Sequence, residues 1–564
     1  MTKRVIFLII AFSLQFLFSA EFYDSKEWLN MLYYVQNGSN YSSLADESSF
    51  FVSKLGKNNP KEEYEMSLKL VEAQDISFRA KYPLRYKRIA KYNHIKYEPI
   101  LKVSQNIHNV IIAYPNRYMN NPASMFGHLF LVLNTDRGIL DSDILHYIAD
   151  TGGERGFSYM VKGLSGQYKG WYLKEPYYKK IKGYNYVEDR DVVYYDLKLS
   201  KEQMEELQLH YIELNNTFFY YYFLDKNCAY FIGKLLNVVL DKEIETTGIY
   251  ILPSEIINEL IRNGLLENER MRVANTKIFN NLYSRLNGQQ KRELITMFHE
   301  KKDNVSSDVD VLNGFILISE YMISNHSELT DSIRFNRIAA YKKINSLQNT
   351  ENIRQLEIKK DVVSLIQSKS MGVSCLGNNT YGMSFSPINF SEYDQFKKID
   401  VINVEALDFK INLLERFHPQ FGVGLIDLDN ILQYNNILNS FSWKIKSSIT
   451  YNDLLLTNQE ISGGVAFNLN NTGMFYVLGG VTYANYDDIF EVKLDDLKLQ
   501  YVLRIGLNNN FTESIKFLVS YKNIYAKDYL SVAFINKYEN FLNKIEVIGG
   551  HDRSILSVGI EYLF

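Results

Sequence analysis

The chain has 564 residues, of which 46% are hydrophobic and 23% charged, so it is neither disordered nor of low complexity. Its 62 basic and 65 acidic residues give a formal net charge of −3, which argues against a nucleic-acid partner. Only two cysteines are present, which excludes a disulfide scaffold and any Cys-rich metal or iron–sulfur site.

Residues 1–20 have the layout of a secretory signal peptide. Lys3 and Arg4 precede an apolar run from 5 to 18, and Ser19-Ala20 supplies small residues for cleavage. The run is shorter than the ~20 residues that a membrane-spanning helix needs, so we expect cleavage rather than an N-terminal anchor. The sequence therefore predicts export, with a mature chain that begins near Glu21.

Three regions that differ in the spacing of their apolar residues and in their charge follow the signal peptide. Residues 21–105 have helical apolar spacing and predict a helical N-terminal domain. Residues 106–240 predict an α+β domain, with short strands at 110–114, 129–133, 144–148 and 191–196. Ser200 and Gln203 have the spacing of a capping box at a helix start. Residues 241–370 are strongly charged, contain little Gly or Pro, and predict a helical region.

Residues 371–564 alternate between apolar and polar side chains, as β-strands do when their two faces differ. In the last strand, four apolar side chains share one face: Leu556, Val558, Ile560 and Tyr562. A soluble sandwich would also alternate. Long strands, aromatic residues near the strand ends and the terminal Phe564 favour an antiparallel transmembrane barrel of about ten to twelve strands.

Cys228 is the candidate nucleophile. It follows the polar turn Asp225-Lys226-Asn227 and precedes an apolar, helix-like run from 229 to 240. Free N–H groups and the helix dipole at such a position favour a thiolate, so we expect a lowered thiol pKa. Cys375 has no histidine close by in the sequence and is expected to be inert.

His128 is the candidate general base, at the head of the predicted strand 129–133 and directly after Gly127. If this strand pairs with strand 144–148, His146 or Asp150 can orient the His128 ring. Other hypotheses are weaker. Asn227 is a candidate positioning or oxyanion residue, and Ser124 either donates to an oxyanion or caps a turn.

Nothing in the sequence predicts a cofactor. The remaining histidines have no metal-ligand spacing, and no Gly-rich phosphate loop is present. Arg190 and Asp191 are expected to form a buried ion pair that fixes the strand at 191–196.

The region from about 107 to 240 resembles the Lnb N-terminal periplasmic domain family. The motifs that carry the resemblance are the run Asn121-Pro122-Ala123-Ser124-Met125-Phe126-Gly127-His128, then Lys162-Gly163-Leu164, Asp189-Arg190-Asp191, and Asp225-Lys226-Asn227-Cys228. The His/Cys pair also resembles permuted NlpC-like and lecithin:retinol acyltransferase-like thiol enzymes, in which the histidine precedes the cysteine, opposite to the papain order. The resemblance implies a permuted papain-like α+β fold.

In the lipoprotein acyltransferases of this family, the resemblance implies that a Cys–His pair moves an acyl chain from a phospholipid to a lipoprotein amino terminus. The implied function is therefore a periplasmic thiol acyltransferase or hydrolase, tethered to the outer membrane of a Gram-negative cell by its own barrel. Outer-membrane lipids, a lipoprotein or phospholipid substrate and the barrel-assembly machinery are the implied partners. Two alternatives stay open: a cell-wall peptide hydrolase of NlpC type and a non-enzymatic outer-membrane scaffold.

Overall fold

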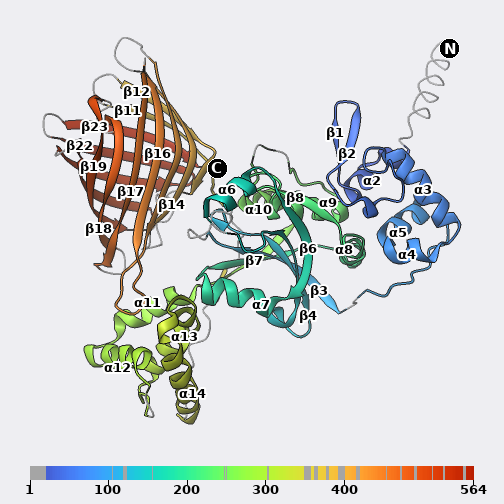
Figure 1. The fold of residues 1–564 in the computed structure, drawn as a ribbon, viewed down its shortest axis with the longest axis horizontal. Coiled ribbons are helices and arrows are strands. Elements are labelled where there is room, and N and C mark those ends of the chain that lie inside the picture. Colours follow the sequence, from blue (N-terminus) through green and yellow to red (C-terminus); the bar gives the residue numbers. More distant parts are fainter. Residues whose placement is uncertain are drawn as a thin grey trace, which may run out of the picture. The chain divides into compact units, whose positions relative to one another are not determined.

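The computed structural model describes residues 21–564 except for 104–105, 118–123, 155, 247, 249, 302–303, 348–356, 361–365, 377–379, 391–400, 414–418, 453, 470–472, 488–491, 511, 513, 525–526, 551–553 and 564. The expected signal peptide, Asn121 to Ala123 and Phe564 thus lie outside the described residues. The chain divides into two compact units, residues 1–365 and 366–564, which are treated separately below (Figure 1).

The first unit begins with a small helical module. Its elements are η1 (Phe22–Asp24), α2 (Lys26–Met31), η2 (Ser48–Phe50), α3 (Pro60–Glu72), α4 (Ile76–Lys81) and α5 (Pro83–Tyr92). The side chains of Ser25, Asn59 and Asp75 cap helices α2, α3 and α4. A hairpin of β1 (Tyr34–Asn37) and β2 (Asn40–Ser43) interrupts the helices, which the helical spacing did not predict.

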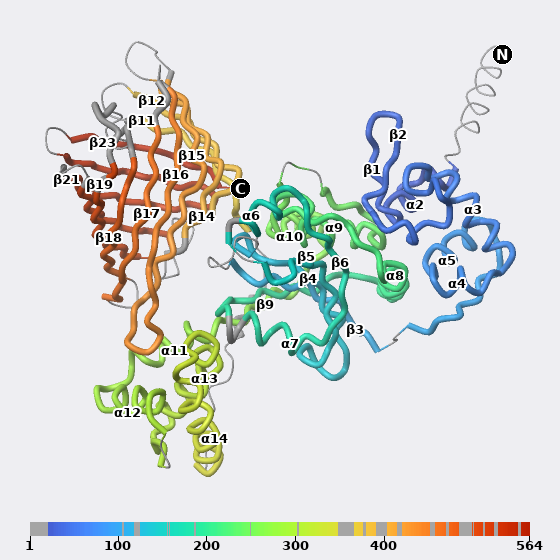
Figure 2. Tube along the Cα trace, in the orientation of Figure 1, coloured from blue at the N-terminus to red at the C-terminus, as the bar shows by residue number. Residues whose placement is uncertain are grey.

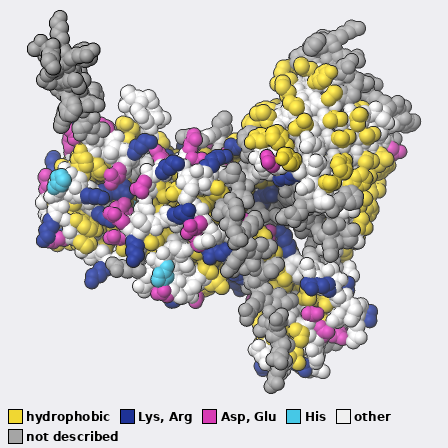
Figure 3. Space-filling model, turned by 180° about the vertical axis from the view of Figure 1, so that it is seen from behind, with side chains coloured by type: hydrophobic (Ala, Val, Ile, Leu, Met, Phe, Trp, Pro, Cys, Tyr) yellow, Lys and Arg dark blue, Asp and Glu magenta, His cyan; other side chains and the backbone are white. Residues whose placement is uncertain are grey.

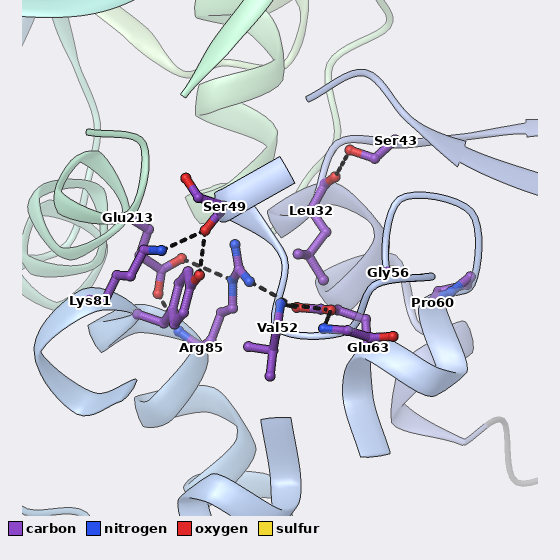
Figure 4. A network of polar contacts seen from close by, with 12 residues as sticks. Leu32, Ser43, Ser49, Val52, Gly56, Pro60, Glu63, Lys81, Arg85 and Glu213 are labelled. Carbon is purple, nitrogen blue, oxygen red and sulfur yellow. Dashed lines mark hydrogen bonds and ion pairs between the residues drawn. The ribbon is translucent and has the colours of Figure 1, made fainter. Parts of the chain in front are cut away.

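A buried ionic cluster joins this module to helix α8 (Lys201–Glu213). The fully buried Arg85 guanidinium lies 3.1 Å from Glu63 and 3.6 Å from Glu213, and the backbone N–H of Arg85 also donates to Glu213 (Figure 4). Glu63 in turn accepts hydrogen bonds from the backbone N–H groups of Val52 and Ser53. Because a buried charge needs partners, this cluster fixes how the module packs on α8.

An eight-stranded antiparallel sheet forms the centre of the first unit, in the order β10-β9-β7-β3-β4-β5-β6-β8. The strands are β3 (Ile107–Pro115), β4 (Phe130–Thr135), β5 (Asp143–Asp150), β6 (Tyr168–Pro176), β7 (Val192–Leu197), β8 (Phe218–Tyr221), β9 (Leu266–Arg272) and β10 (Glu357–Lys360). All four strands expected between 106 and 240 are present. The expected pairing of β4 with β5 is also present, with Phe130 opposite His146.

Helices cover both faces of this sheet (Figure 2). On one face, α7 (Tyr177–Ile181) and η5 (Lys182–Val187) pack over apolar side chains of β3, β4, β5 and β7. On the other face lie α8, which begins with the expected capping box at Ser200, and α9 (Cys228–Val239), which contacts β4 and β5.

Residues 241–360 contain α10 (Pro253–Arg262), α11 (Asn275–Arg285), α12 (Gly288–His299), α13 (Val309–Asn325), η6 (Ser327–Leu329) and α14 (Thr330–Ser346), together with β9 and β10. The two strands are an addition to the helices that the sequence predicts. The Asp191 carboxylate accepts from the backbone N–H of Ala274 and pairs with Lys277 at 2.7 Å, which ties β7 to the start of α11.

The second unit is a closed antiparallel barrel. Its strands are β11 (Ser370–Leu376), β12 (Thr380–Ser386), β14 (Val401–Leu413), β15 (Pro419–Ile431), β16 (Ser442–Asn452), β17 (Leu454–Asn468), β18 (Gly473–Asp487), β19 (Val492–Asn510), β20 (Ile515–Ile524), β21 (Lys527–Tyr538), β22 (Phe541–Gly549) and β23 (Ser554–Leu563). β11 pairs with β23, and β12 with β14, so the ladder of 12 strands closes on itself. The short β13 (Ile388–Phe390) adds to β14.

The barrel wall is apolar outside and polar inside, as expected. Leu556, Val558, Ile560 and Tyr562 are exposed on the outer face, and Figure 3 shows hydrophobic side chains spread over the wall. Charged side chains of the inner face pair with each other, as in the contacts of Lys444 with Asp427 and Asp429 and of Arg504 with Glu460. This is the polarity of a transmembrane barrel rather than of a soluble sandwich.

Among the described helices, none combines the length and the apolar composition that a membrane crossing requires.

Candidate functional site

Cys228 lies at the first residue of α9, as the sequence predicts, and its side chain is buried. Asn227 is the N-cap of this helix, and its Oδ1 accepts hydrogen bonds from the backbone N–H groups of Ala229 (3.0 Å) and Tyr230 (3.2 Å). The Nδ2 of Asn227 donates to the carbonyl of Ile251 at 2.7 Å. Both ends of the Asn227 amide thus hold the helix start in place, and a role for Asn227 in the reaction stays a prediction.

Three groups donate hydrogen bonds toward the Cys228 sulfur: the backbone N–H groups of Leu129 and Ala229 and the hydroxyl of Tyr221. Leu129 directly follows His128 in the chain. The fold therefore brings the turn that carries the candidate base to the sulfur of the candidate nucleophile, across 100 residues of sequence.

His128 lies between a tight turn and the start of β4. The preceding Gly127 has a φ of +95°, and a side chain there would collide with the ring of Tyr114, so glycine is required. The backbone N–H of His128 donates to the carbonyl of Pro115 at 3.2 Å. The imidazole lies against the rings of Phe130 and Tyr184, and its Nε2 is buried without a hydrogen-bond partner among the described residues.

Arg190 holds the neighbouring end of β3 in place through hydrogen bonds to its backbone. Its guanidinium donates to the carbonyls of Pro115 (3.0 Å) and Asn116 (2.6 Å) and pairs with Glu188 at 2.8 Å. The expected ion pair of Arg190 with Asp191 is replaced here by separate pairs, Arg190 with Glu188 and Asp191 with Lys277. The Arg190 charge is also close enough to act on both Cys228 and His128.

The electrostatic environment favours the neutral forms of both the Cys228 thiol and the His128 imidazole. Burial raises the pKa of the Cys228 thiol, although the Leu129 N–H, the Tyr221 hydroxyl and the Arg190 charge oppose the increase. Burial also lowers the pKa of His128 well below its usual value, and the nearby His146, Arg190 and Lys180 add to this effect. The expectation of a lowered thiol pKa was therefore wrong in sign, because burial outweighs the helix terminus.

His146 is fully buried on β5, on the same face as Phe130, and is close enough to His128 to affect its pKa. Its Nε2 lies 3.0 Å from a carboxylate oxygen of Glu175, without the alignment of a hydrogen bond. Burial lowers the pKa of His146 to about 3, so its ring is neutral. Asp150 is exposed at the end of β5 and accepts from the N–H of Gly152. An orienting role for His146 stays a prediction.

Ser124 is half-buried in the turn before His128, and its carbonyl accepts from the N–H of Gly127 at 3.0 Å. Because this contact is made by the backbone, it does not distinguish between the two alternatives for the Ser124 hydroxyl, which stay predictions. Cys375 lies on the outer face of β11, opposite Val558, far in sequence from the other site residues. Among the described residues, no group of three or more His, Cys, Asp or Glu side chains converges as a metal site.

Sequence reasoning missed Tyr221 and the Leu129 amide. Tyr221 belongs to the aromatic run from Phe218 to Phe223, in which spacing alone distinguishes no member. Its proximity to Cys228 arises from the pairing of β8 with β6, which spacing along the chain does not reveal.

Residues 96–263 match the family model of the Lnb N-terminal periplasmic domain. The match includes His128, Leu129, Arg190, Tyr221 and Cys228. The chain carries a Lnb N-terminal periplasmic domain. Residues 20–92 match a second model, described as a domain of unknown function (DUF7843), which corresponds to the helical module in front of the Lnb domain.

Solved structures of outer-membrane proteins are similar to part of this chain. The KdgM porin in complex with disordered oligogalacturonate is 11% identical and covers 35% of this chain and 99% of its own, with a TM-score of 0.25. The NanC porin (8%, 35% and 99%, TM-score 0.23) and Omp33 of Acinetobacter baumannii (8%, 35% and 99%, TM-score 0.21) give comparable values. With such TM-scores, the barrel assignment rests on its own strand pairing. No curated protein matches the chain.

The periplasmic family and the closed barrel with its apolar outer wall together define where the protein resides. It is an outer-membrane protein whose Lnb domain lies in the periplasm.

Proposed function

We propose that this protein is a thiol acyltransferase or hydrolase that acts on acyl groups of lipids or lipoproteins through Cys228 and His128. The observation that carries the proposal is the hydrogen bond from the Leu129 N–H to the Cys228 sulfur, which brings the residue after His128 to the thiol. A buried cysteine and a histidine whose next residue donates to the cysteine sulfur supply the two side-chain types that nucleophilic acyl transfer needs.

The chemistry follows from the resting protonation states. The neutral imidazole of His128 accepts the thiol proton as the sulfur attacks an ester or amide carbonyl. The carbonyl then re-forms, the carbon–oxygen or carbon–nitrogen bond breaks, and His128 returns the proton to the leaving group. The thioester passes its acyl chain to an amine or to water.

An apolar surface on helix α6 supports a lipid substrate. Helix α6 (Gly156–Leu164) leaves Met160, Val161 and Leu164 exposed. The ring of Phe223 packs on Gly163 of this helix, and the Phe223 N–H donates to the Gly163 carbonyl at 3.0 Å. Since Phe223 precedes Cys228 by only five residues, the apolar face of α6 is joined to the nucleophile's own loop. A peptide substrate would need polar partners instead.

The decisive experiment measures release or transfer of a labelled acyl chain from phospholipid by the full chain in proteoliposomes, with a cell-wall peptide as competing substrate. Cys228→Ser should abolish turnover, because a serine hydroxyl is far from ionised near neutral pH. His128→Ala should lower kcat by ~10²–10⁴-fold, since this is the range of a general base. The losses should be non-additive in the double variant, because both residues serve one proton transfer.

Cys375→Ser is the matched control, because it removes the other thiol from the outer wall of the barrel and should leave turnover unchanged. Wild-type turnover by Cys228→Ser would refute the thiol mechanism. Turnover of the peptide alone would instead support the cell-wall hydrolase. An alkylating lipid probe that labels Cys228 equally well in the wild type and in His128→Ala, without any turnover, would support a scaffold.

A further inference from the structure

We infer that the Tyr221 hydroxyl, together with the Leu129 N–H, is a catalytic hydrogen-bond donor that stabilises the thiolate of Cys228. This inference rests on the proposed function and assigns the anion-binding part of the site to residues that the sequence did not indicate.

Thiolates are usually stabilised by the free backbone N–H groups at a helix N-terminus, but in α9 these groups already donate to other acceptors. The N–H of Cys228 donates to the Tyr221 oxygen at 3.3 Å. The N–H groups of Ala229 and Tyr230 donate to Asn227 Oδ1, and the N–H of Phe231 donates to the Asn227 carbonyl at 3.1 Å. Only the Ala229 N–H is shared with the sulfur. Helix α9 thus offers an anion formed here only this shared N–H, and the other donors come from outside the helix.

Tyr221 is held rigidly in the position of such a donor. It is the last residue of β8 and pairs with Tyr168 of β6. Its buried ring is stacked on that of Tyr147, with centroids 5.6 Å apart and planes 7° apart. Because the hydroxyl oxygen accepts the Cys228 N–H, the hydroxyl proton is left to point toward the sulfur.

The donor keeps its proton throughout the reaction. Burial raises the pKa of Tyr221 well above its usual value, so the phenol does not compete with His128 as a base. When His128 takes the thiol proton, the negative charge on sulfur meets the Tyr221 O–H and the Leu129 N–H. As the sulfur–carbon bond forms, one electron pair moves onto the carbonyl oxygen. That pair re-forms the carbonyl as the bond to the leaving group breaks, and His128 protonates that group.

Tyr221→Phe tests this role, because it removes one oxygen atom and keeps the ring. Tyr147→Phe is the matched control: its ring is equally buried in the same stack, but its hydroxyl donates to the carbonyl of Phe219 at 3.1 Å. Both variants are made in the full chain with Cys375→Ser, so that Cys228 is the single thiol. The readouts are the pH midpoint of iodoacetamide alkylation and kcat for acyl release.

Tyr221→Phe should raise the alkylation midpoint by about one pH unit, which is about tenfold in thiolate fraction, and should lower kcat by ~10²-fold. Tyr147→Phe should change neither by more than about twofold. The inference would be overturned if the alkylation midpoint and kcat of Tyr221→Phe matched those of Tyr147→Phe. If Tyr221→Phe fails to fold, a fluorotyrosine at position 221 keeps the shape and strengthens the donor, and an unchanged midpoint would then overturn it.

The two proposals fail in different ways. A wild type without acyl turnover, in which Tyr221→Phe still shifts the alkylation midpoint, would remove the proposed function and keep the assignment of Tyr221. A wild type with turnover, and a Tyr221→Phe variant with unchanged kcat and midpoint, would remove only the assignment of Tyr221.

Discussion

Replacing Asn227 with alanine should destabilise the Lnb domain without removing a group that takes part in the chemistry. The substitution deletes the cap oxygen that accepts from Ala229 and Tyr230, and the amide that donates to Ile251 at 2.7 Å. Loss of an N-cap costs about 0.5–2 kcal/mol. A buried carbonyl left without its donor costs about 1–3 kcal/mol. We therefore expect a total loss of about 2–4 kcal/mol in the free energy of unfolding.

Asn227→Ser separates the two contributions, because serine keeps an oxygen that caps the helix and lacks the amide donor to Ile251. It should recover about 1 kcal/mol relative to Asn227→Ala. The assay is urea unfolding of the full chain in detergent, followed by the fluorescence of Trp28 and Trp171, together with kcat of the folded fraction. Neither variant removes a group that donates to the Cys228 sulfur, so kcat of the folded fraction should fall by less than about tenfold.

The opposite pattern would refute this assignment. If Asn227→Ala kept full stability and lost about 10²-fold in kcat, the Asn227 amide would be an oxyanion donor. The cap geometry would then be incidental to its function.

The structure makes three further predictions. Burial lowers the pKa of His146 to about 3, so below pH 6.5 the unfolded chain binds a proton that the fold excludes. From pH 7 to 5 the wild type should lose about 2 kcal/mol more stability than His146→Asn, and equal losses would contradict the neutral ring. Val558→Lys on the lipid face should lower the stability of the barrel by about 2–4 kcal/mol and impair its assembly, measured by heat-modifiable migration on a gel. Ser557→Lys in the lumen should assemble normally. Normal assembly of Val558→Lys together with failure of Ser557→Lys would mean that the inner and outer faces are assigned the wrong way round. In Gly163→Val, the valine side chain should collide with the Phe223 ring, which should reduce both the stability of the domain and acyl release. Gly183→Ala should be neutral, because no atom lies near that position. Equal effects of the two substitutions would show that the packing of Phe223 on Gly163 is not required.

Local patterns in the sequence predicted most of the architecture. The barrel was recognisable because alternation has a period of two residues and persists over each strand, so that the faces of the strand at Leu556 to Tyr562 could be assigned before the structure. Cys228 and His128 were recognisable because each stands at a boundary, one at a helix start and the other at a strand head.

The remaining features depend on contacts between distant segments. The sign of the Cys228 pKa shift follows from burial, which no local pattern reports. Strand β9 was missed because charged residues occupy it, and these are satisfied by ion pairs across the sheet, such as Arg270 with Asp196 and Glu267 with Lys198. Periodicity of apolar residues cannot detect a strand of this kind.

The ionic cluster at Arg85 bears on which part of this protein can fold on its own. Arg85 belongs to the segment that matches one family model, and its partner Glu213 belongs to the segment that matches another. Separation of the two would break the Arg85–Glu213 pair and leave Glu63 as the remaining carboxylate partner of Arg85. Breaking a buried pair of this kind costs about 3–5 kcal/mol. We therefore expect the two stretches that match separate family models to unfold together. A Lnb fragment released by proteolysis at the junction near residue 93 would lose Arg85 and the rest of the helical module together.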